Sequence, residues 1–287
     1  MVISRLIGGL GNQMFQYAAG RALAVSNNCE LKLDVSGYKN YTLHNGYELN
    51  LFKIQANIAT DVEISGFVKG QSRLSRFISK KLKLKNKSHL IEKNFDYDPS
   101  FFEIKRPIYI DGYWQSYQYF ESIESQLKLE LTPTIRLSGL NLTISKQIAK
   151  CNSVSLHIRR GDYVSNLEAN KTHGFIGIEY YNKAISFIHE QVLHPHFFVF
   201  SDDIAWAREN LGLNINVVFI NHNQGRSSFE DMRLMSLCKY NIIANSSFSW
   251  WGAWLNTDPN KIVIAPKQWF ANMQDTSNLM PDNWLKM

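Results

Sequence analysis

Residues 153–164 read SVSLHIRRGDYV, and this stretch decides the fold. Ser153 to Ile158 has the apolar character of a short buried strand, and the strand ends at once in charged residues and glycine. Downstream, apolar runs of the same kind alternate with segments of helical periodicity. This alternation predicts a layered α/β fold with parallel strands.

The same pattern extends from this strand in both directions. Towards the C-terminus we expect strands at residues 197–200, 217–220, 241–244 and 262–265, separated by helices at 179–190, 205–211, 230–239 and 250–255. Towards the N-terminus we expect strands at 2–7, 30–35 and 108–110 and a helix at 12–25. The pattern loosens around residues 132–145, where we expect a domain boundary.

A chain of 287 residues is long for one typical domain and suits two. We therefore predict an N-terminal α/β domain, residues 1–140, and a C-terminal α/β domain, residues 141–287. The last helix of the second domain could pack back on the first.

The composition is that of an ordinary soluble protein, with 45% apolar and 20% charged residues. A net charge of +6 favours anionic partners such as nucleotide sugars, phospholipid head groups or nucleic acid. Nucleic acid fits poorly because the basic residues are not interleaved with stacking aromatics. Three scattered cysteines, Cys29, Cys151 and Cys238, argue against a disulfide framework and a zinc site. With no signal-peptide core or membrane span in the sequence, a cytoplasmic location is expected.

The residues that follow the deciding strand are suited to binding a phosphate. His157 and Arg159 are two residues apart in a strand, so they should lie on one face. Arg159 and Arg160 come where the strand ends, and ligands of open α/β sheets gather at the carboxyl ends of strands. Two adjacent guanidinium groups offer forked donors that match phosphate oxygens. The alternative is that one arginine pairs with Asp162 or another carboxylate.

A second strand end carries acidic residues. The apolar run at 197–200 leads directly into Ser201, Asp202 and Asp203. Ser201 or Asp202 can cap the next helix. An aspartate here can also accept hydrogen bonds from the N1 and amino groups of a guanine, and the two roles can coexist on neighbouring residues.

A third strand end carries a serine-rich turn. The strand at 241–244 is followed by Asn245, Ser246 and Ser247, and then by a helix that we expect to start near Trp250. Backbone N–H groups and serine hydroxyls at a helix start form an anion pocket. The paired tryptophans Trp250 and Trp251 are more typical of core packing.

The first strand is followed by a glycine-rich loop. Gly8, Gly9 and Gly11 allow a close backbone approach between strand and helix, although their spacing does not match a dinucleotide fingerprint. The loop is either a tight packing turn or one side of a cleft, to which Asn12 and Gln13 would then contribute.

Taken together, GGLGNQMFQYAAG, HIRRGDYV, FVFSDD and NSSFSWWGAWLN resemble the bacterial galactoside α-1,2-fucosyltransferases of glycosyltransferase family 11. The resemblance spans residues 8 to about 270 and weakens over residues 39–107. It implies a GT-B architecture, in which two Rossmann-like domains face each other across a cleft. It also implies an inverting transfer of fucose from GDP-β-L-fucose to the 2-hydroxyl of a β-galactoside, without a required metal or other cofactor.

The resemblance further implies roles for individual residues. The C-terminal domain would bind GDP-fucose, and the N-terminal domain would lie on the acceptor side, with Gly9, Gly11, Asn12 and Gln13 at the cleft. In the C-terminal domain Arg159 would bind the pyrophosphate and Arg160 would support it. His157 and Asp202 would meet the guanosine, and the turn residues Asn245, Ser246 and Ser247 would face the phosphates.

The catalytic base is less well defined by the sequence. Asp162 is the preferred candidate for activating the galactose 2-hydroxyl, and Glu168, Glu179 and His44 are alternatives. A strongly dissociative transition state would need little help from a base. Asp96-Tyr97-Asp98 has the form of a metal-binding Asp-x-Asp motif, but the adjacent proline makes a turn the simpler interpretation.

Residues 69–87 carry eight basic residues and no acidic one, at a spacing that fits an amphipathic helix. Such a run is usually a solvated face. It could instead contact anionic lipid at the inner face of the cytoplasmic membrane, or the diphosphate of a lipid-linked acceptor in surface-polysaccharide or O-antigen synthesis. Two other functions stay open: a GDP-sugar transferase of different linkage or acceptor, and a non-catalytic glycan-binding module.

Overall fold

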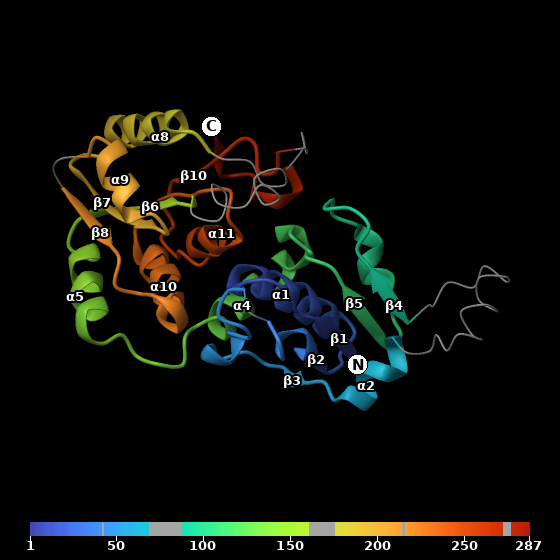
Figure 1. Ribbon diagram of the computed structural model, residues 1–287. Helices are drawn as coiled ribbons and strands as arrows, with labels where there is room; N and C mark the ends of the chain where they lie inside the picture. Colours follow the sequence, from blue (N-terminus) through green and yellow to red (C-terminus); the bar gives the residue numbers. More distant parts are fainter. Residues whose placement is uncertain (42, 69–87, 161–175, 214–215, 272–276) are drawn as a thin grey trace. The chain divides into compact units, whose positions relative to one another are not determined.

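The computed structural model describes residues 1–41, 43–68, 88–160, 176–213, 216–271 and 277–287 (Figure 1). These residues divide into two compact units, Met1–Thr134 and Ile135–Met287. Each unit is built around one parallel sheet. The predicted basic helix at 69–87 lies outside the described residues.

The sheet of the first unit has the strand order β3-β2-β1-β5-β4, with every neighbouring pair parallel. Its strands are β1 (Val2–Arg5), β2 (Leu31–Asp34), β3 (Asn57–Ile58), β4 (His89–Ile91) and β5 (Ile108–Asp111). The helices described in this unit are α1 (Leu10–Ser26), α2 (Asp61–Val68) and α4 (Glu124–Glu130). Short 3-10 turns include η1 (Ser36–Tyr38) and η3 (Pro99–Glu103).

Helix α1 forms the centre of the first unit. Its sequence has apolar residues on every side, and Met14, Phe15 and Leu23 are completely buried. A helix without a polar face is stable only when it is enclosed by other elements. On the sheet itself, Ile3 of β1 and Tyr109 of β5 join a buried cluster with Phe67 of α2.

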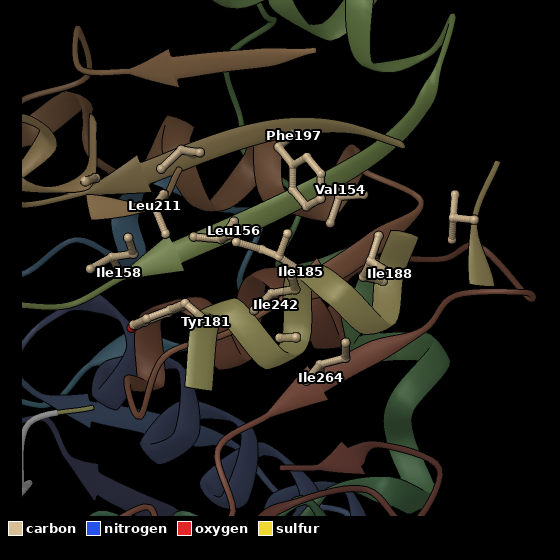
Figure 2. Close-up of a cluster of buried hydrophobic side chains, with 14 residues drawn as sticks. Val154, Leu156, Ile158, Tyr181, Ile185, Ile188, Phe197, Leu211, Ile242 and Ile264 are labelled. Carbon is tan, nitrogen blue, oxygen red and sulfur yellow. The ribbon is translucent and has the colours of Figure 1, made fainter. Parts of the chain in front are cut away.

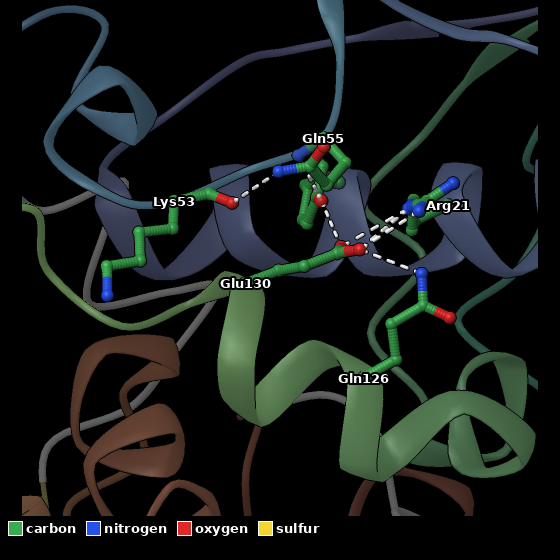
Figure 3. A network of polar contacts seen from close by, with 6 residues as sticks. Arg21, Lys53, Gln55, Gln126 and Glu130 are labelled. Atoms are coloured by element: carbon green, nitrogen blue, oxygen red, sulfur yellow. Dashed lines mark hydrogen bonds and ion pairs between the residues drawn. The ribbon is translucent and has the colours of Figure 1, made fainter.

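One buried ionic network fixes α1 to α4 (Figure 3). The Tyr17 hydroxyl donates to the Glu130 carboxylate and accepts the Gln55 backbone N–H at 2.9 Å. Arg21 pairs with Glu130, with Nη2 to Oε1 at 3.0 Å, and Gln126 Nε2 donates to the same oxygen at 2.8 Å. A buried carboxylate is tolerated because these donors replace the water that it loses.

The second unit contains a larger sheet with the order β11-β10-β9-β6-β7-β8, again parallel throughout. Its strands are β6 (Asn152–Ile158), β7 (Pro195–Ser201), β8 (Val217–Ile220), β9 (Tyr240–Ile242), β10 (Val263–Ala265) and β11 (Leu285–Lys286). The helices described here are α5 (Gly139–Ile148), α8 (Ile178–Gln191), α9 (Ile204–Asn210), α10 (Phe229–Leu237) and α11 (Ser247–Trp254).

Side chains of the central strands alternate between two cores. Val154, Leu156 and Ile158 of β6 pack with α8 and α9 on one face (Figure 2). Phe198 and Phe200 of β7 lie in a second cluster, together with residues of α5 and α10. Strands buried on both faces read as nearly continuous apolar runs, and this is why the sequence located them well.

Tyr180, in the first turn of α8, links this helix to two strand ends. Its hydroxyl lies 2.7 Å from the carbonyl oxygen of Ile243, just after β9, and 3.0 Å from that of Ile264 in β10. Burial raises the pKa of this hydroxyl well above its ordinary value, so it stays protonated and can donate. The start of α8 is thereby held at the carboxyl edge of the sheet.

The structure confirms an α/β fold with two parallel sheets and differs from the prediction in detail. The loose region at 132–145 contains α5, and the predicted boundary after residue 140 falls inside this helix. The chain ends in β11, which pairs with β10, and the packing of the last helix against the first unit stays a prediction. Trp284, just before β11, packs its ring 5.3 Å from that of Trp250 and fixes this segment within the second unit.

Among the described residues, the helices are too short or too polar to cross a membrane.

Candidate functional site

Three of the predicted loops meet at one edge of the six-stranded sheet. Strand β6 lies between β9 and β7, and all three are parallel, so their carboxyl ends share an edge. Residues 159–160, 201–203 and 245–247 follow these three ends in turn. The structure therefore brings together the arginines, the acidic residues and the serine turn that the sequence marked. Asp162 and Glu168 lie outside the described residues.

Arg159 is held by the loop after β7. Its Nη1 lies 3.2 Å from Oδ2 of Asp202, and the other oxygen of that carboxylate accepts the Arg160 backbone N–H at 2.9 Å. Both side chains are about one quarter exposed, at 28% for Arg159 and 25% for Asp202. A carboxylate that engages the chain at two adjacent points fixes where the guanidinium charge lies.

Arg160 has different neighbours. Its Nε lies 3.3 Å from Oδ2 of Asp203, and its guanidinium carbon lies 4.5 Å from the ring centre of Trp206. Asp203 also caps α9, since its Oδ1 accepts the Trp206 backbone N–H at 3.1 Å. An ion pair combined with a cation–π contact holds Arg160 against the protein surface.

His157 is the second-last residue of β6, before the two arginines, and is 6% exposed. Burial, together with the nearby Arg159 charge, lowers the pKa of its imidazole to about 3, so the ring is neutral. Its Nδ1 is buried without a hydrogen-bond partner among the described residues. The Phe248 ring lies 6.0 Å away and links this strand end to the first turn of α11. In a neutral ring the Nδ1 of His157 can either donate or accept one hydrogen bond.

The serine turn forms the start of α11 at Ser247, three residues earlier than the sequence predicted. Ser246 is the N-cap residue, and its side chain makes no capping hydrogen bond. Ser246 and Ser247 are half-buried, whereas Asn245 is buried and donates to the Trp269 carbonyl at 3.3 Å. Because the first N–H groups of a helix have no partner within it, this turn offers donors to an anion.

A polar network lies further along the same edge, after β8. Asn223 Nδ2 donates to Asp231 Oδ1 at 2.7 Å, and its amide exchanges hydrogen bonds with that of Asn141. Asn141 Oδ1 also lies 2.7 Å from His222 Nε2. Burial, with Glu230 nearby, raises the pKa of Asp231 to about 7. No role had been predicted for these residues from the sequence.

In the first unit, the glycine loop is built tightly around the start of α1. Gly9 is the N-cap residue, and a Cβ added there would lie 3.3 Å from Cγ of His44. Gly11 is buried. Asn12 Oδ1 accepts a hydrogen bond from Gln115 at 2.8 Å, whereas Gln13 is completely buried.

The Gln13 amide makes hydrogen bonds with the backbone of the surrounding loops. Its Nε2 donates to the carbonyls of Gly8 at 3.1 Å and Gly46 at 2.8 Å, and its Oε1 accepts the Glu48 N–H at 2.9 Å. Gln13 thus joins two loops, whereas the Asn12 side chain is half-buried. A cleft role for the four predicted residues stays a prediction.

The remaining candidates are dispersed. Glu179 is exposed in the first turn of α8, and His44 lies in the first unit. Asp98 caps η3 by accepting the Ser100 N–H at 3.0 Å, which confirms that Asp96-Tyr97-Asp98 belongs to a turn. Among the described residues, His, Cys, Asp and Glu do not form a cluster that would hold a metal. The three cysteines are free thiols.

Sequence reasoning missed two aromatic members of the site. Trp206 covers Arg160, and Phe248 lies beside His157. An aromatic residue one turn after a capping aspartate is the only signal for Trp206, and it is weak, because aromatic residues are common on amphipathic helices. Phe248 was part of a quoted motif but carried no distinct signal.

Comparison with known proteins shows which family the chain belongs to. The family model described as Glycosyl transferase family 11 matches residues 2–287. An alpha-1,2-colitosyltransferase of Escherichia coli is 40% identical and aligns over 100% of this chain and 99% of its own length. The O-antigen biosynthesis glycosyltransferase WbnK of Escherichia coli is 36% identical, over 99% of both chains. The galactoside alpha-(1,2)-fucosyltransferase 2 of Rattus norvegicus is 27% identical, over 87% of this chain and 65% of its own.

A solved structure supports the same fold. The fucosyltransferase NodZ from Bradyrhizobium aligns with a TM-score of 0.53 at 13% identity, over 88% of this chain and 92% of its own. This likeness, together with the two parallel sheets, confirms the GT-B type of fold. At such low identity it concerns the fold alone.

Proposed function

The chain belongs to glycosyltransferase family 11, and from this premise we propose that it transfers L-fucose from GDP-β-L-fucose to a terminal β-galactoside. The sugar is joined to the 2-hydroxyl with inversion, which gives an α-1,2 linkage. The product belongs to an oligosaccharide or to an O-antigen type of surface glycan. The names of the relatives support this class of reaction, because they include α-1,2 transfer, O-antigen biosynthesis and a galactoside acceptor.

The observation that carries the proposal is the placement of Arg159. Its guanidinium lies at the carboxyl end of β6, is held by Asp202, and shares the sheet edge with the serine turn at the start of α11. Fixed positive charge and backbone N–H donors at one edge are suited to a pyrophosphate. Arg160 supports this arrangement from the Asp203 and Trp206 side.

The chemistry follows from where charge develops. As the acceptor oxygen bonds to the anomeric carbon, the bond from that carbon to the phosphate oxygen breaks, and the electron pair leaves with GDP. The acceptor proton passes to a base, for which Asp162 remains the preferred candidate, or to solvent. Arg159 stabilises the charge that accumulates on the departing diphosphate, and a preorganised donor is worth more there than in water.

We propose that no metal is required, because fixed guanidinium charge takes the place of a bound cation. His157 and Asp202 are proposed to meet the guanosine portion of the donor. The neutral, buried His157 ring can give or accept one hydrogen bond, which suits a nucleoside better than a phosphate. The basic stretch at 69–87 is proposed to favour an anionic or lipid-linked acceptor at the membrane surface.

A second donor is favoured by a specific finding. The α-1,2-colitosyltransferase aligns along the whole chain. Colitose is L-fucose without its 3-hydroxyl, so the two donors share the nucleotide and the same linkage chemistry. A site that hydrogen-bonds this hydroxyl would reject colitose strongly, whereas an apolar site would discriminate much less.

Donor binding and product analysis test the proposal together. Calorimetry with GDP-fucose, GDP-colitose, GDP-mannose and UDP-galactose should give the tightest binding for GDP-fucose. NMR of the product formed with lactose should show an α-1,2 linkage, and turnover should persist in EDTA. Preference for GDP-colitose would establish the second donor. Binding of galactosides without turnover of any nucleotide sugar would instead indicate a glycan-binding module, and activity restored only by manganese would overturn the metal-free mechanism.

A further inference from the structure

The carboxyl edge of the five-stranded sheet carries a second group of polar and aromatic residues. Glu92 follows β4, and Tyr113, Trp114 and Gln115 follow the neighbouring strand β5. These residues were not among the site candidates from the sequence. The glycine loop after β1 belongs to the same edge, because β1 pairs with β5 on its other side.

The Glu92 carboxylate is positioned by the backbone. Its two oxygens accept the N–H groups of Tyr113 at 2.6 Å and Trp114 at 3.0 Å. Trp114 has a φ of 54°, a left-handed conformation that is rare for a bulky side chain. Strain of this kind is concentrated at functional sites. Here it lets two successive N–H groups point at one carboxylate.

This carboxylate keeps capacity for further donors. A carboxylate offers about four lone-pair positions, and the described contacts of Glu92 use two. Its side chain is half-buried. Burial, followed by the proximity of Asp111, raises its pKa to about 7. The charge of Asp111 is compensated by Arg5, whose Nη1 lies 3.0 and 2.9 Å from its two oxygens. Of these two acidic groups, Glu92 is therefore the one that is half-buried without a compensating positive charge among its described contacts.

Tyrosine rings gather next to this carboxylate. We call Tyr38, Tyr41 and Tyr113 the tyrosine surface, and all three are half-buried rather than part of the core. Tyr38 and Tyr41 pack edge to face, with ring centres 5.3 Å apart. Burial chiefly raises the pKa of both hydroxyls, and Tyr113 lies near enough to contribute to each rise. Tyr113 is itself stacked on Phe95 at 6.1 Å.

A buried acceptor lies on the same edge. Gln115 is 8% exposed, and its Nε2 donates to Asn12 at 2.8 Å. Its Oε1 has no hydrogen-bond partner among the residues that the structure describes. An unsatisfied buried acceptor costs free energy, and a bound hydroxyl would repay that cost. The glycine loop connects it to the tyrosine surface, since the Tyr38 hydroxyl donates to the Gly8 carbonyl at 2.8 Å.

We propose that this edge binds the acceptor sugar, with hydroxyls donating to Glu92 and Gln115 and a C–H face resting on the tyrosine surface. The proposal rests on the proposed function. A neutral sugar fits because its hydroxyls are donors and its C–H groups carry a small positive charge that aromatic faces attract. A phosphate fits poorly, because the Glu92 oxygens are acceptors here and their ionised form repels an anion.

Two variants with one control test the proposal, using lactose as acceptor at saturating GDP-fucose. Glu92→Gln removes the charge, and its new amide N–H must also face a backbone donor. We expect the KM for lactose to rise about 10-fold or more, with GDP affinity unchanged in calorimetry. Glu103→Gln, which changes an exposed carboxylate of the same unit, should alter neither quantity.

Tyr113→Leu provides an independent test, because it keeps Glu92 and the Tyr113 N–H. We expect the KM for lactose to rise about 5-fold and the slow hydrolysis of GDP-fucose in the absence of acceptor to continue. An unchanged KM in this variant and in Glu92→Gln would overturn the proposal. If the wild-type protein binds no GDP-fucose, the proposed function fails instead. Saturation-transfer NMR with lactose then tests the surface directly, and it is overturned if both variants bind as the wild type does.

Discussion

The two sheets end in the same geometry but present different chemistry. At the carboxyl edge of the six-stranded sheet lie two arginines, each paired with an aspartate, together with serine hydroxyls and a helix start. At the corresponding edge of the five-stranded sheet lie a backbone-bound carboxylate and half-buried tyrosines. Parallel topology thus decides where ligands can bind, and the few residues after each strand decide which ligand is bound.

The largest expected effect on turnover concerns Arg159, at the carboxyl edge of the six-stranded sheet. Arg159→Ala should lower transfer by about 100- to 1,000-fold, because it removes the charge that stabilises the leaving diphosphate. Arg159→Lys should recover only part of this, since an ammonium cannot bind two phosphate oxygens in a forked manner. Turnover and circular dichroism should be measured beside Arg226→Ala, an exposed arginine of the same unit. Near-normal turnover of Arg159→Ala would remove it from the donor site.

Asp202→Asn separates two roles of one carboxylate. The amide oxygen can still accept the Arg160 N–H, but the ion pair with Arg159 is lost. We expect GDP affinity to fall about 10-fold and the preference for GDP over UDP to fall with it, as measured by calorimetry with both nucleotides. A preference that stays at the wild-type level would show instead that Asp202 only positions Arg159 and does not contact the guanine.

Gly252→Ala tests how the serine turn is supported. A Cβ at Gly252 of α11 would lie 2.9 Å from Cβ of Met235 in α10. Overpacking of this kind costs about 1–3 kcal/mol. Thermal unfolding should therefore begin several degrees lower, by roughly 2–8 °C. Gly66→Ala is the matched control, because the added methyl group meets open space in α2 and favours the helix. Equal melting temperatures for Gly252→Ala and wild type would contradict the close packing.

The smallest expected effect concerns Asp231, whose pKa is raised to about 7. Because the folded protein holds this proton more tightly than the unfolded chain, its contribution to stability is present at low pH and is lost as pH rises towards 7. Asp231→Asn keeps an acceptor for Asn223 and removes the charge. Its melting temperature should exceed that of wild type by a few degrees at pH 8 and converge with it near pH 4. A constant difference across this range would exclude the titration of Asp231 as the cause.

The buried strands and helices were predicted correctly from the sequence, whereas the short and exposed ones were missed. The central strands β6 and β7 and the helix α8 were located because they are long, apolar or strongly periodic. Strands β3 and β4 were missed because they are two and three residues long and contain no fully buried residue. Helix α5 was missed because its few apolar contacts, Ile144 and Ile148, lie in a polar segment.

Some site residues could likewise be predicted from the sequence, and others could not. Arg159, Asp202 and Ser246 could be found because each lies within a few residues of the end of a recognisable strand. Glu92 could not, because it follows the unrecognised β4 and owes its position to the backbone of residues about twenty positions away. Pairs such as Arg21 and Glu130 are also invisible in sequence, since only the fold makes them neighbours.

The two hydrogen bonds of the Tyr180 hydroxyl to the strand ends have a practical consequence for engineering. Residue 160 is tied to Asp202, and the first turn of α8 is tied to the ends of two strands, so both junctions of the segment 161–175 are anchored to the same sheet. That segment can therefore be exchanged between relatives as a cassette, with the grafting points at Arg160 and Ile176. Chimaeras made this way would exchange residues 161–175 and keep the anchors on both sides of them.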